Sequence, residues 1–334
     1  MQSLLSTISL PDFVDLVRRD FATNVQMVKP VVSQLFIVDQ IGKGMGNSKL
    51  YEEYDVQTYA RNKKEGQAVA KASVGTGYSK TLYKKRVGIE VDITQEMRDE
   101  NRYSEVGAQI TNLSQFCPQR EELDGTHVFT FAGATSYVDM DGDTVNIATG
   151  DGLSLINTAH TLKFSTATYS NEVSGDPVFS ETALEAAELL AVTNIVSNYN
   201  ERRVVNFRSI VTSDYPTVCN NVARLLKSTA YVAANYSAGV ENVYMNKYTH
   251  VVLPQLATTA QAVYNSAKKN YWFFIANGQG TNGWQGYKGV FEAPHLKTPG
   301  FDHYSRDIWS FGTRSGYGYA SVTGRGIIGS LNAS

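Results

Sequence analysis

Residues 104–131 have the sequence SEVGAQITNLSQFCPQREELDGTHVFTF. Apolar side chains recur at helical spacing along one face: Val106, Ile110, Leu113 and Cys117. Pro118 should kink a helix here, but the helical pattern resumes to about Phe131. The stretch therefore predicts one helix of about 28 residues, about 40 Å long at 1.5 Å per residue. Such a helix is long for a globular core and is typical of a spine that crosses a flat molecule.

The segment before this helix predicts a long basic β-hairpin. Residues 31–41 are expected to form a strand, and residues 49–59 and 78–93 alternate as two further strands around a polar tip at 61–77. Residues 43–86 carry ten Lys and Arg against four acids, a net charge of +6. An isolated two-stranded ribbon is marginal in water, so we expect the hairpin to dock on something else.

A short amphipathic helix is predicted at residues 11–24, with Phe13, Leu16, Val17 and Phe21 on its apolar side. Its apolar stripe is narrow, and nothing adjacent in sequence covers it. We expect it to pack on the underside of the long helix or on another copy of the chain.

The second half of the chain predicts a compact α/β layer over residues 190–285. Residues 133–176 are rich in Gly, Asp, Thr and Ser and predict loops with short strands. Helices are expected at 180–196, 216–230 and 258–268, and strands at 204–212, 251–253 and 271–276. Residues 308–328 look strand-like.

Composition indicates a folded chain of 334 residues, with 42% hydrophobic and 19% charged residues and a net charge of -2. The low net charge argues against a dedicated nucleic-acid-binding surface. The longest apolar run, 271–276, is far short of the ~20 residues that span a bilayer. Cys117 and Cys219 are too few for a disulfide framework or a four-cysteine zinc site.

Charge is unevenly distributed: residues 139–190 carry nine acids against Lys163 alone, a net charge of -8. This acidic stretch could pair with the basic hairpin, within one molecule or between copies. The two could equally be separate solvated faces.

Motifs for catalysis, metal binding and cofactor binding are weak. Residues 278–283 (GQGTNG) match the pattern GxGxxG. A dinucleotide site requires a helix directly after this pattern, but two more glycines and no helical pattern follow here. Residues 139–143 (DMDGD) lack the later ligands of a calcium loop and predict an acidic turn. His160 is expected to be structural. We predict no catalytic residues, no metal site and no cofactor.

Three stretches carry a family resemblance: Leu155–His160 (LINTAH), Val211–Thr217 (VTSDYPT), and Trp309–Gly312 (WSFG) leading to Gly324–Ser330 (GRGIIGS). With the order of predicted elements, the chain resembles the major capsid protein of tailed double-stranded-DNA bacteriophages, which has the Hong Kong ninety-seven-type fold. The resemblance implies an α+β fold with four parts. They are an N-terminal arm (1–41), an extended β-hairpin loop (42–88), a peripheral domain with the spine helix (89–189 and 286–321) and an α/β axial domain (190–285 and 322–334).

The resemblance implies a structural protein, not an enzyme. It would self-assemble into hexamers and pentamers, forming an icosahedral or prolate head around the packaged genome. Assembly would take place in the host cytoplasm and the protein would end in the virion, without membrane contact or sequence-specific DNA binding. A portal protein, a decoration protein and a scaffolding protein are the implied partners. The family often has a long scaffolding extension before the arm, and because this sequence begins close to the arm we expect a separate scaffolding protein.

Contacts between subunits are expected from two groups of residues. The hairpin supplies the basic group: Arg61, Lys63, Lys64, Lys71, Lys84, Lys85 and Arg86. The N-terminal helix supplies the apolar group: Phe13, Leu16, Val17 and Phe21. The alternative interpretation is an α/β enzyme or nucleotide-binding protein that uses the glycine-rich segment 278–289.

Overall fold

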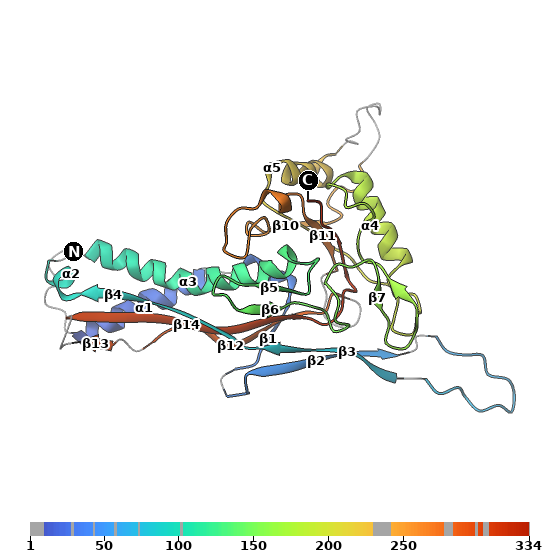
Figure 1. The fold of residues 1–334 in the computed structure, drawn as a ribbon, viewed down its shortest axis with the longest axis horizontal. Coiled ribbons are helices and arrows are strands. Elements are labelled where there is room, and N and C mark those ends of the chain that lie inside the picture. The colour runs from blue at the N-terminus through green and yellow to red at the C-terminus, as the bar shows by residue number, and fades with distance from the viewer. Residues whose placement is uncertain are drawn as a thin grey trace.

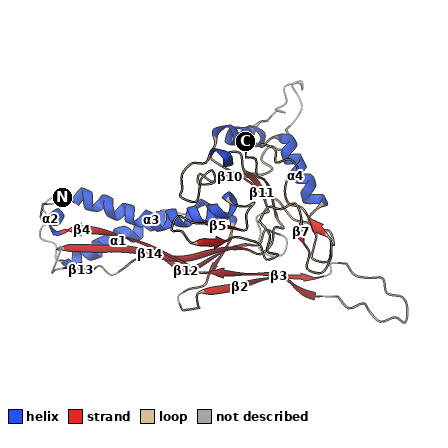
Figure 2. Ribbon diagram, viewed as in Figure 1, coloured by secondary structure: helices blue, strands red, loops and turns tan. Residues whose placement is uncertain are grey.

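The computed structural model describes residues 10–27, 30–42, 44–56, 59–72, 74–100, 103–229, 242–276, 283–297, 300–302 and 307–333. The molecule is elongated: a long helix over a sheet forms one end, a second sheet with two helices rises beside it, and a hairpin projects from the other end (Figure 1). Helices and strands are both plentiful (Figure 2), which confirms the expected α+β class.

The long helix is α3 (Tyr103–Thr130), so the prediction at 104–131 is confirmed, with Pro118 inside it. Short helix α2 (Gln95–Asp99) precedes it. Helix α1 (Leu10–Met27) packs on α3, and its Val17 and Phe21 share a buried cluster with Val106, Ile110 and Leu113. Of the two packings expected for the N-terminal helix, the structure therefore shows the one on the long helix.

A five-stranded sheet lies under α3. Its strands are β1 (Ile37–Gln40), β12 (Gly286–Leu296), β14 (Ile308–Ser321), β13 (Gly300–Asp302) and β4 (Lys85–Thr94). Strand β14 pairs antiparallel with β12, β13 and β4, while β1 runs parallel to β12. The strand predicted at 31–41 is only partly correct. Val31–Leu35 forms a 3-10 helix after Pro30, and the Glu122 carboxylate accepts from the Val32 N–H.

The hairpin consists of β2 (Ser48–Val56) and β3 (Val74–Tyr83). The single strand expected at 78–93 is two strands, because the chain changes partner at Lys84: β3 pairs with β2, and β4 pairs with β14. Residues 59–72 of the tip are exposed throughout.

The second sheet has the strand order β10-β9-β11-β15, from β9 (Ser209–Thr212), β10 (Thr249–Val252), β11 (Trp272–Ile275) and β15 (Ile327–Ser330). Helices α4 (Glu181–Thr193) and α5 (Pro216–Lys227) share one buried cluster with this sheet. Ser180 caps α4 by accepting from the Ala183 N–H, and proline begins α5, both as the sequence predicts. The boundary expected at 189/190 falls inside α4.

The helix predicted at 258–268 is wrong. Thr258 bridges to Tyr264, Ala262 has a positive φ of 59°, and only Ser266–Lys268 forms a 3-10 turn. The hydroxyls explain the error: Thr258 donates to the Gln255 carbonyl, and Thr259 accepts from two nearby backbone N–H groups. Such local bonds compete with a helix.

Short strands fill the 133–176 region as expected: β5 (Ser136–Val138), β6 (Thr144–Asn146), β7 (His160–Thr161) and β8 (Thr168–Tyr169). They form two small hairpins, β5-β6 and β7-β8. Both cysteines are free. None of the helices in the described ranges is long and apolar enough to cross a bilayer.

Candidate functional site

The base of the hairpin docks on the rest of the chain through alternate side chains of β2. Tyr51, Glu53 and Asp55 are buried, while Leu50 before them and Tyr54 among them are 53% and 60% exposed. This period of two shows that β2 presents one face to the body of the molecule and the other to solvent.

Glu53 is the centre of this docking. Its side chain is fully buried and forms ion pairs with Arg325 and, at 3.4 Å, with Arg203 Nη1. Asn198 completes the cluster: its Nδ2 donates to Glu53 Oε2 at 2.9 Å, and its Oδ1 accepts from Arg325 Nη2 at 2.9 Å. Burial lowers the pKa of the Arg203 guanidinium, against the opposing effect of Glu53. A carboxylate from the hairpin is thus held by two guanidiniums from the body.

Two further contacts fix the same joint. The Asn198 backbone N–H donates to Asp55 Oδ2 at 2.7 Å, which ties a second hairpin carboxylate to the same turn. Opposite Glu53, a Cβ at Gly77 would lie 2.7 Å from Asn198 Nδ2 and from Glu53 Oε2. Glycine is therefore required for β3 to approach the cluster closely.

The basic tip of the hairpin lies where the sequence placed it. Arg61, Lys63, Lys64 and Lys71 are all exposed, and no ion pair is recorded for them with any residue that the structure describes. Their role as contacts between subunits stays a prediction.

Lys84 and Lys85 depart from the expectation, because both pair within their own chain. Lys84 Nζ lies 3.5 Å from Glu292 Oε2, and Lys85 Nζ lies 2.9 Å from Asp124 Oδ2 and 2.7 Å from Asp139 Oδ2. The charges of these two lysines are therefore neutralised within their own chain, and their role as contacts with a second subunit stays a prediction. Arg86 is exposed, and its Nη2 donates to Asn47 Oδ1 at 3.5 Å.

Two of the four apolar residues predicted on α1, Val17 and Phe21, pack within the subunit itself. Val17 is 0% exposed and Phe21 is 4% exposed, which leaves little of either side chain for a contact with another subunit. The side chains of Phe13 and Leu16 lie outside the described residues.

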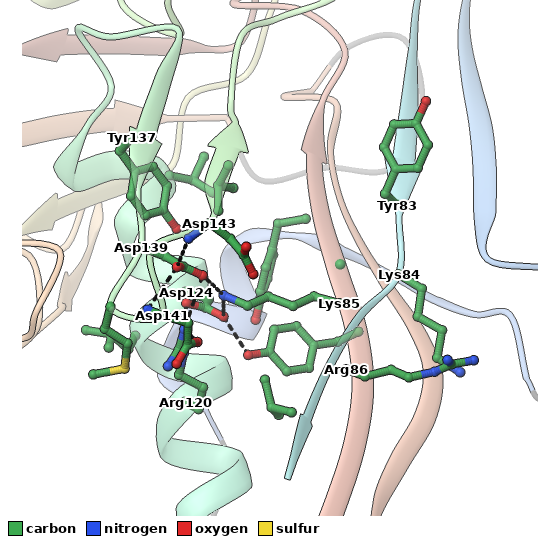
Figure 3. A pocket seen from close by; sticks show the side chains of 18 of the residues that line it. Tyr83, Lys84, Lys85, Arg86, Arg120, Asp124, Tyr137, Asp139, Asp141 and Asp143 are labelled. Atoms are coloured by element: carbon green, nitrogen blue, oxygen red, sulfur yellow. Dashed lines mark hydrogen bonds and ion pairs between the residues drawn. The ribbon is translucent and has the colours of Figure 1, made fainter.

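A cleft of about 1150 Å³ separates β4 from α3 and the β5-β6 turn (Figure 3). Arg120 of α3 reaches Asp124 Oδ1 at 3.2 Å, Asp139 Oδ2 at 3.4 Å and Asp141 Oδ2 at 2.8 Å. With Lys85 on the same carboxylates and the Tyr317 hydroxyl donating to Asp124 at 2.6 Å, the charges of the cleft satisfy one another. The arrangement holds α3 to the sheet.

Much of the acidic stretch 139–190 is used inside the chain. Burial opposes ionisation of Asp139, but hydrogen bonds from Lys85 and two backbone N–H groups outweigh it and lower its pKa. Asp151 bonds to His160 Nδ1 at 2.7 Å, and His160 is completely buried, as expected of a structural histidine. The predicted pairing of basic and acidic segments therefore occurs partly within one molecule, through Lys85 and Asp139.

Sequence reasoning missed that the second half of α3 buries charge. Glu121 pairs at 2.9 Å with Lys288 of β12, and both side chains are less than 10% exposed. Burial raises the pKa of the neighbouring Glu122, although the Val32 N–H bonded to it works in the opposite direction. The spacing of these acids along the helix was visible in the sequence, but their partners are far away in the chain.

The end of α3 meets the 253–268 loop at a ring cluster. His127 is 1% exposed and makes edge contacts with Phe131 and Tyr137, which stack on each other. Lys268 Nζ lies 3.6 Å from the centre of the Phe131 ring. Burial lowers the pKa of Lys268 to about 8 and that of His127 to about 4, with Asp124 opposing the shift at His127.

The remaining motifs of the sequence do not assemble a site. Residues 278–282 of the GxGxxG segment lie outside the described residues, and strand β12 follows at Gly286, where a dinucleotide site needs a helix. The 139–143 segment is a turn, in which the Asp139 N–H donates to the Asp143 carbonyl. Among the described residues, no group of three or more His, Cys, Asp or Glu is arranged to hold a metal ion.

Comparison with known proteins gives structural matches only. No protein-family model matches the chain, and no curated protein matches its sequence. The structure is similar to the capsid of the Cyanophage P-SCSP1u, with 12% identity over 88% of this chain and 85% of that chain and a TM-score of 0.50. It is also similar to the capsid of Ralstonia phage GP4, with 13% identity over 88% of this chain and 86% of that chain and a TM-score of 0.49. A virus-like particle from Pyrococcus furiosus is similar with 12% identity over 94% of this chain and 97% of that chain and a TM-score of 0.47.

The chain has the capsid fold that the sequence predicted. The likeness to the cyanophage capsid covers most of both chains, so it concerns the whole architecture. In this fold the Glu53 cluster is the joint between the projecting hairpin and the body.

The Glu53 joint can be tested by Glu53→Gln, which keeps the shape and removes the charge. Two buried guanidiniums then lose their carboxylate, and breaking a buried pair in this way costs about 3–5 kcal/mol. Urea unfolding of the purified chain should show this loss, together with faster protease cleavage at the hairpin base. Glu52→Gln, one residue along on the exposed face, should change stability by less than about 0.5 kcal/mol. Equal stability of the two variants would mean that the cluster does not hold the hairpin.

His127 predicts a dependence of stability on pH. Its pKa is about 4 in the folded chain and ordinarily 6.5, so the unfolded chain takes up the proton first as pH falls. Its contribution is complete above pH 6.5 and declines by about 1.4 kcal/mol per pH unit down to about pH 4. Urea unfolding of the wild type and His127→Phe at pH 8, 6 and 5 measures it: the phenylalanine variant should have the shallower slope. Parallel curves would contradict the assignment.

Proposed function

We propose that the chain is the structural subunit of a viral shell, which assembles as hexamers and pentamers around packaged double-stranded DNA. The observation that carries the proposal is the capsid fold, matched over 88% of this chain by the Cyanophage P-SCSP1u capsid. Shell formation would follow from mass action, since many modest interfaces repeated over a closed lattice stabilise it together.

The hairpin supports this role. Its outer face exposes Leu50 (53%), Tyr54 (60%) and Tyr83 (73%), and its tip exposes four basic side chains. A two-stranded ribbon with an apolar outer face is marginal in water, and a second copy of the chain would cover it. The chain's low share of charged residues, 19%, suits a protein that buries surface against others.

We assign the parts of the subunit as the sequence predicted, with two changes. The assignment starts from the four predicted parts: the arm (1–41), the extended loop (42–88), the peripheral domain (89–189 and 286–321) and the axial domain (190–285 and 322–334). The loop ends at Lys84, because β4 belongs to the five-stranded sheet. Helix α4 joins the axial domain, because its buried residues pack with α5 and the four-stranded sheet.

The wider setting is proposed on the same basis. The protein would reside in the virion after assembly in the host cytoplasm, with a portal protein, a separate scaffolding protein and a decoration protein as partners. It would enclose DNA without reading its sequence, which agrees with the net charge of -2. We assign it a structural role without enzymatic activity, which the capsid fold supports.

Electron microscopy and light scattering of the purified chain test the proposal. We expect rings or closed shells, with particle masses in the megadalton range. A chain that stays monomeric or dimeric at high concentration, and binds a nucleotide, would contradict the proposal and support the enzyme alternative.

The basic tip predicts assembly that weakens as salt rises, because exposed ion pairs contribute only about 0.2–1 kcal/mol each and are screened. Asp143, an exposed acid of the 139–190 stretch, is a candidate partner on a neighbouring subunit. Lys63→Glu with Lys64→Glu should slow assembly several-fold at low salt while leaving the thermal unfolding temperature unchanged. Light scattering at two salt concentrations measures the rates. Identical rates for variant and wild type at both would show that the tip only solvates the loop.

A further inference from the structure

Helices α4 and α5 lie at opposite flanks of the four-stranded sheet. The strand order is β10-β9-β11-β15, and α5 packs on β10 while α4 packs on β15. Both helices bury one side in the same cluster, α4 through Ala183, Leu184 and Ala187. Their other sides therefore face away from this cluster; in Figure 1 α5 lies along the top of the domain and α4 at its right.

The outer side of α4 is acidic and apolar. The helix contains Glu181, Glu185 and Glu188 and no basic residue, and Glu185 is exposed. Leu189 and Val192 follow one turn apart and are 63% and 51% exposed. Two large aliphatic side chains beside carboxylates form a surface that remains uncovered in the isolated chain.

The outer side of α5 is polar and basic. Its exposed residues are spaced three or four apart on the face opposite the buried one: Thr217, Asn220, Arg224 and Lys227. They line a shallow hollow with Asn221, Ala223 and Ser228. The helix carries two positive charges and no acid.

We propose that the outer face of α4 on one copy of the chain docks into the hollow on α5 of the next copy. This inference rests on the proposed function and names one contact within its capsomer. Glu181 and Glu185 oppose Arg224 and Lys227, and Leu189 and Val192 pack on Ala223 and the aliphatic stems of the two basic side chains. Because the two faces differ, the contact is head-to-tail. Such a contact forms a ring where its rotation closes, and the proposed capsomer is that ring.

Complementary charge reversals test the contact. Glu181→Lys with Glu185→Lys gives a chain whose two faces are both basic, and Arg224→Glu with Lys227→Glu gives a chain whose two faces are both acidic. Neither pair of residues takes part in a recorded ion pair among the described residues, and circular dichroism confirms folding first. Each variant alone should give about tenfold fewer rings or shells at equal concentration, because each meets like charge at every contact.

Mixing provides the decisive measurement. In an equimolar mixture the basic α4 of one variant meets the acidic α5 of the other, and the acidic α4 meets the basic α5. Six-membered rings that alternate the two variants should recover, as native mass spectrometry of differently tagged chains would show. The chain with all four reversals should also assemble. Glu96→Lys, a reversal on α2 at the far end of the molecule, should behave as the wild type.

The outcomes separate the two proposals. A wild-type chain that forms no rings or shells removes the proposed function and this contact with it. A wild type that assembles, with both reversal variants assembling equally well, leaves the function standing and overturns the contact. Variants that fail alone and are not recovered by mixing or by the fourfold reversal also overturn it, since α4 and α5 would then not face each other. If a double reversal unfolds the chain, Glu185→Lys and Arg224→Glu alone are used in the same way.

Discussion

The ion pair between Glu53 and Arg325 joins three parts of the molecule at one buried point. Glu53 belongs to the hairpin, Arg325 to the link between the two sheets, and Asn198, bonded to both, to the turn after α4. Burying ions is unfavourable unless each finds its partners in good geometry, so small displacements of the hairpin would leave a charge unpaired. A hydrophobic joint would tolerate such displacements. The charged joint specifies one orientation of the hairpin.

The same principle operates beneath α3. Past Pro118 its buried side chains include the acids Glu121 and Asp124, which meet Lys288 of β12 and Lys85 of β4 under the helix. The first half of the helix packs through aliphatic and aromatic side chains instead. One helix therefore packs through apolar contacts in its first half and adds strict ionic contacts to apolar ones in its second half, where Phe129 also packs on Phe273 of the second sheet.

The sequence predicted the elements whose signals are local. The spacing along 104–131 located α3 to within a residue at each end, and Ser180 and Pro216 marked the starts of α4 and α5. The prediction from sequence failed where a residue's burial or pairing depends on partners far away in the chain. Glu53 and Arg325 are 272 residues apart, so nothing near Glu53 shows that it is buried. Lys85 was expected to contact another subunit, and nothing near it shows that it pairs with Asp139. The helix expected at 258–268 does not form, because the hydroxyls of Thr258 and Thr259 make hydrogen bonds with nearby backbone groups.

The link between the sheets decides how a shell of this subunit could curve. Strand β14 ends at Ser321 and β15 begins at Ile327, so five residues connect the two sheets. Within them, a Cβ at Gly324 would lie 2.6 Å from His160 Nε2, Gly326 has a φ of 82°, and Arg325 is held by Glu53. A connection this short, with each of its last three residues constrained, leaves little freedom between the sheets. Differences in curvature between hexamers and pentamers would then arise at contacts between subunits, where the hairpin tip and the flanks of the four-stranded sheet are exposed.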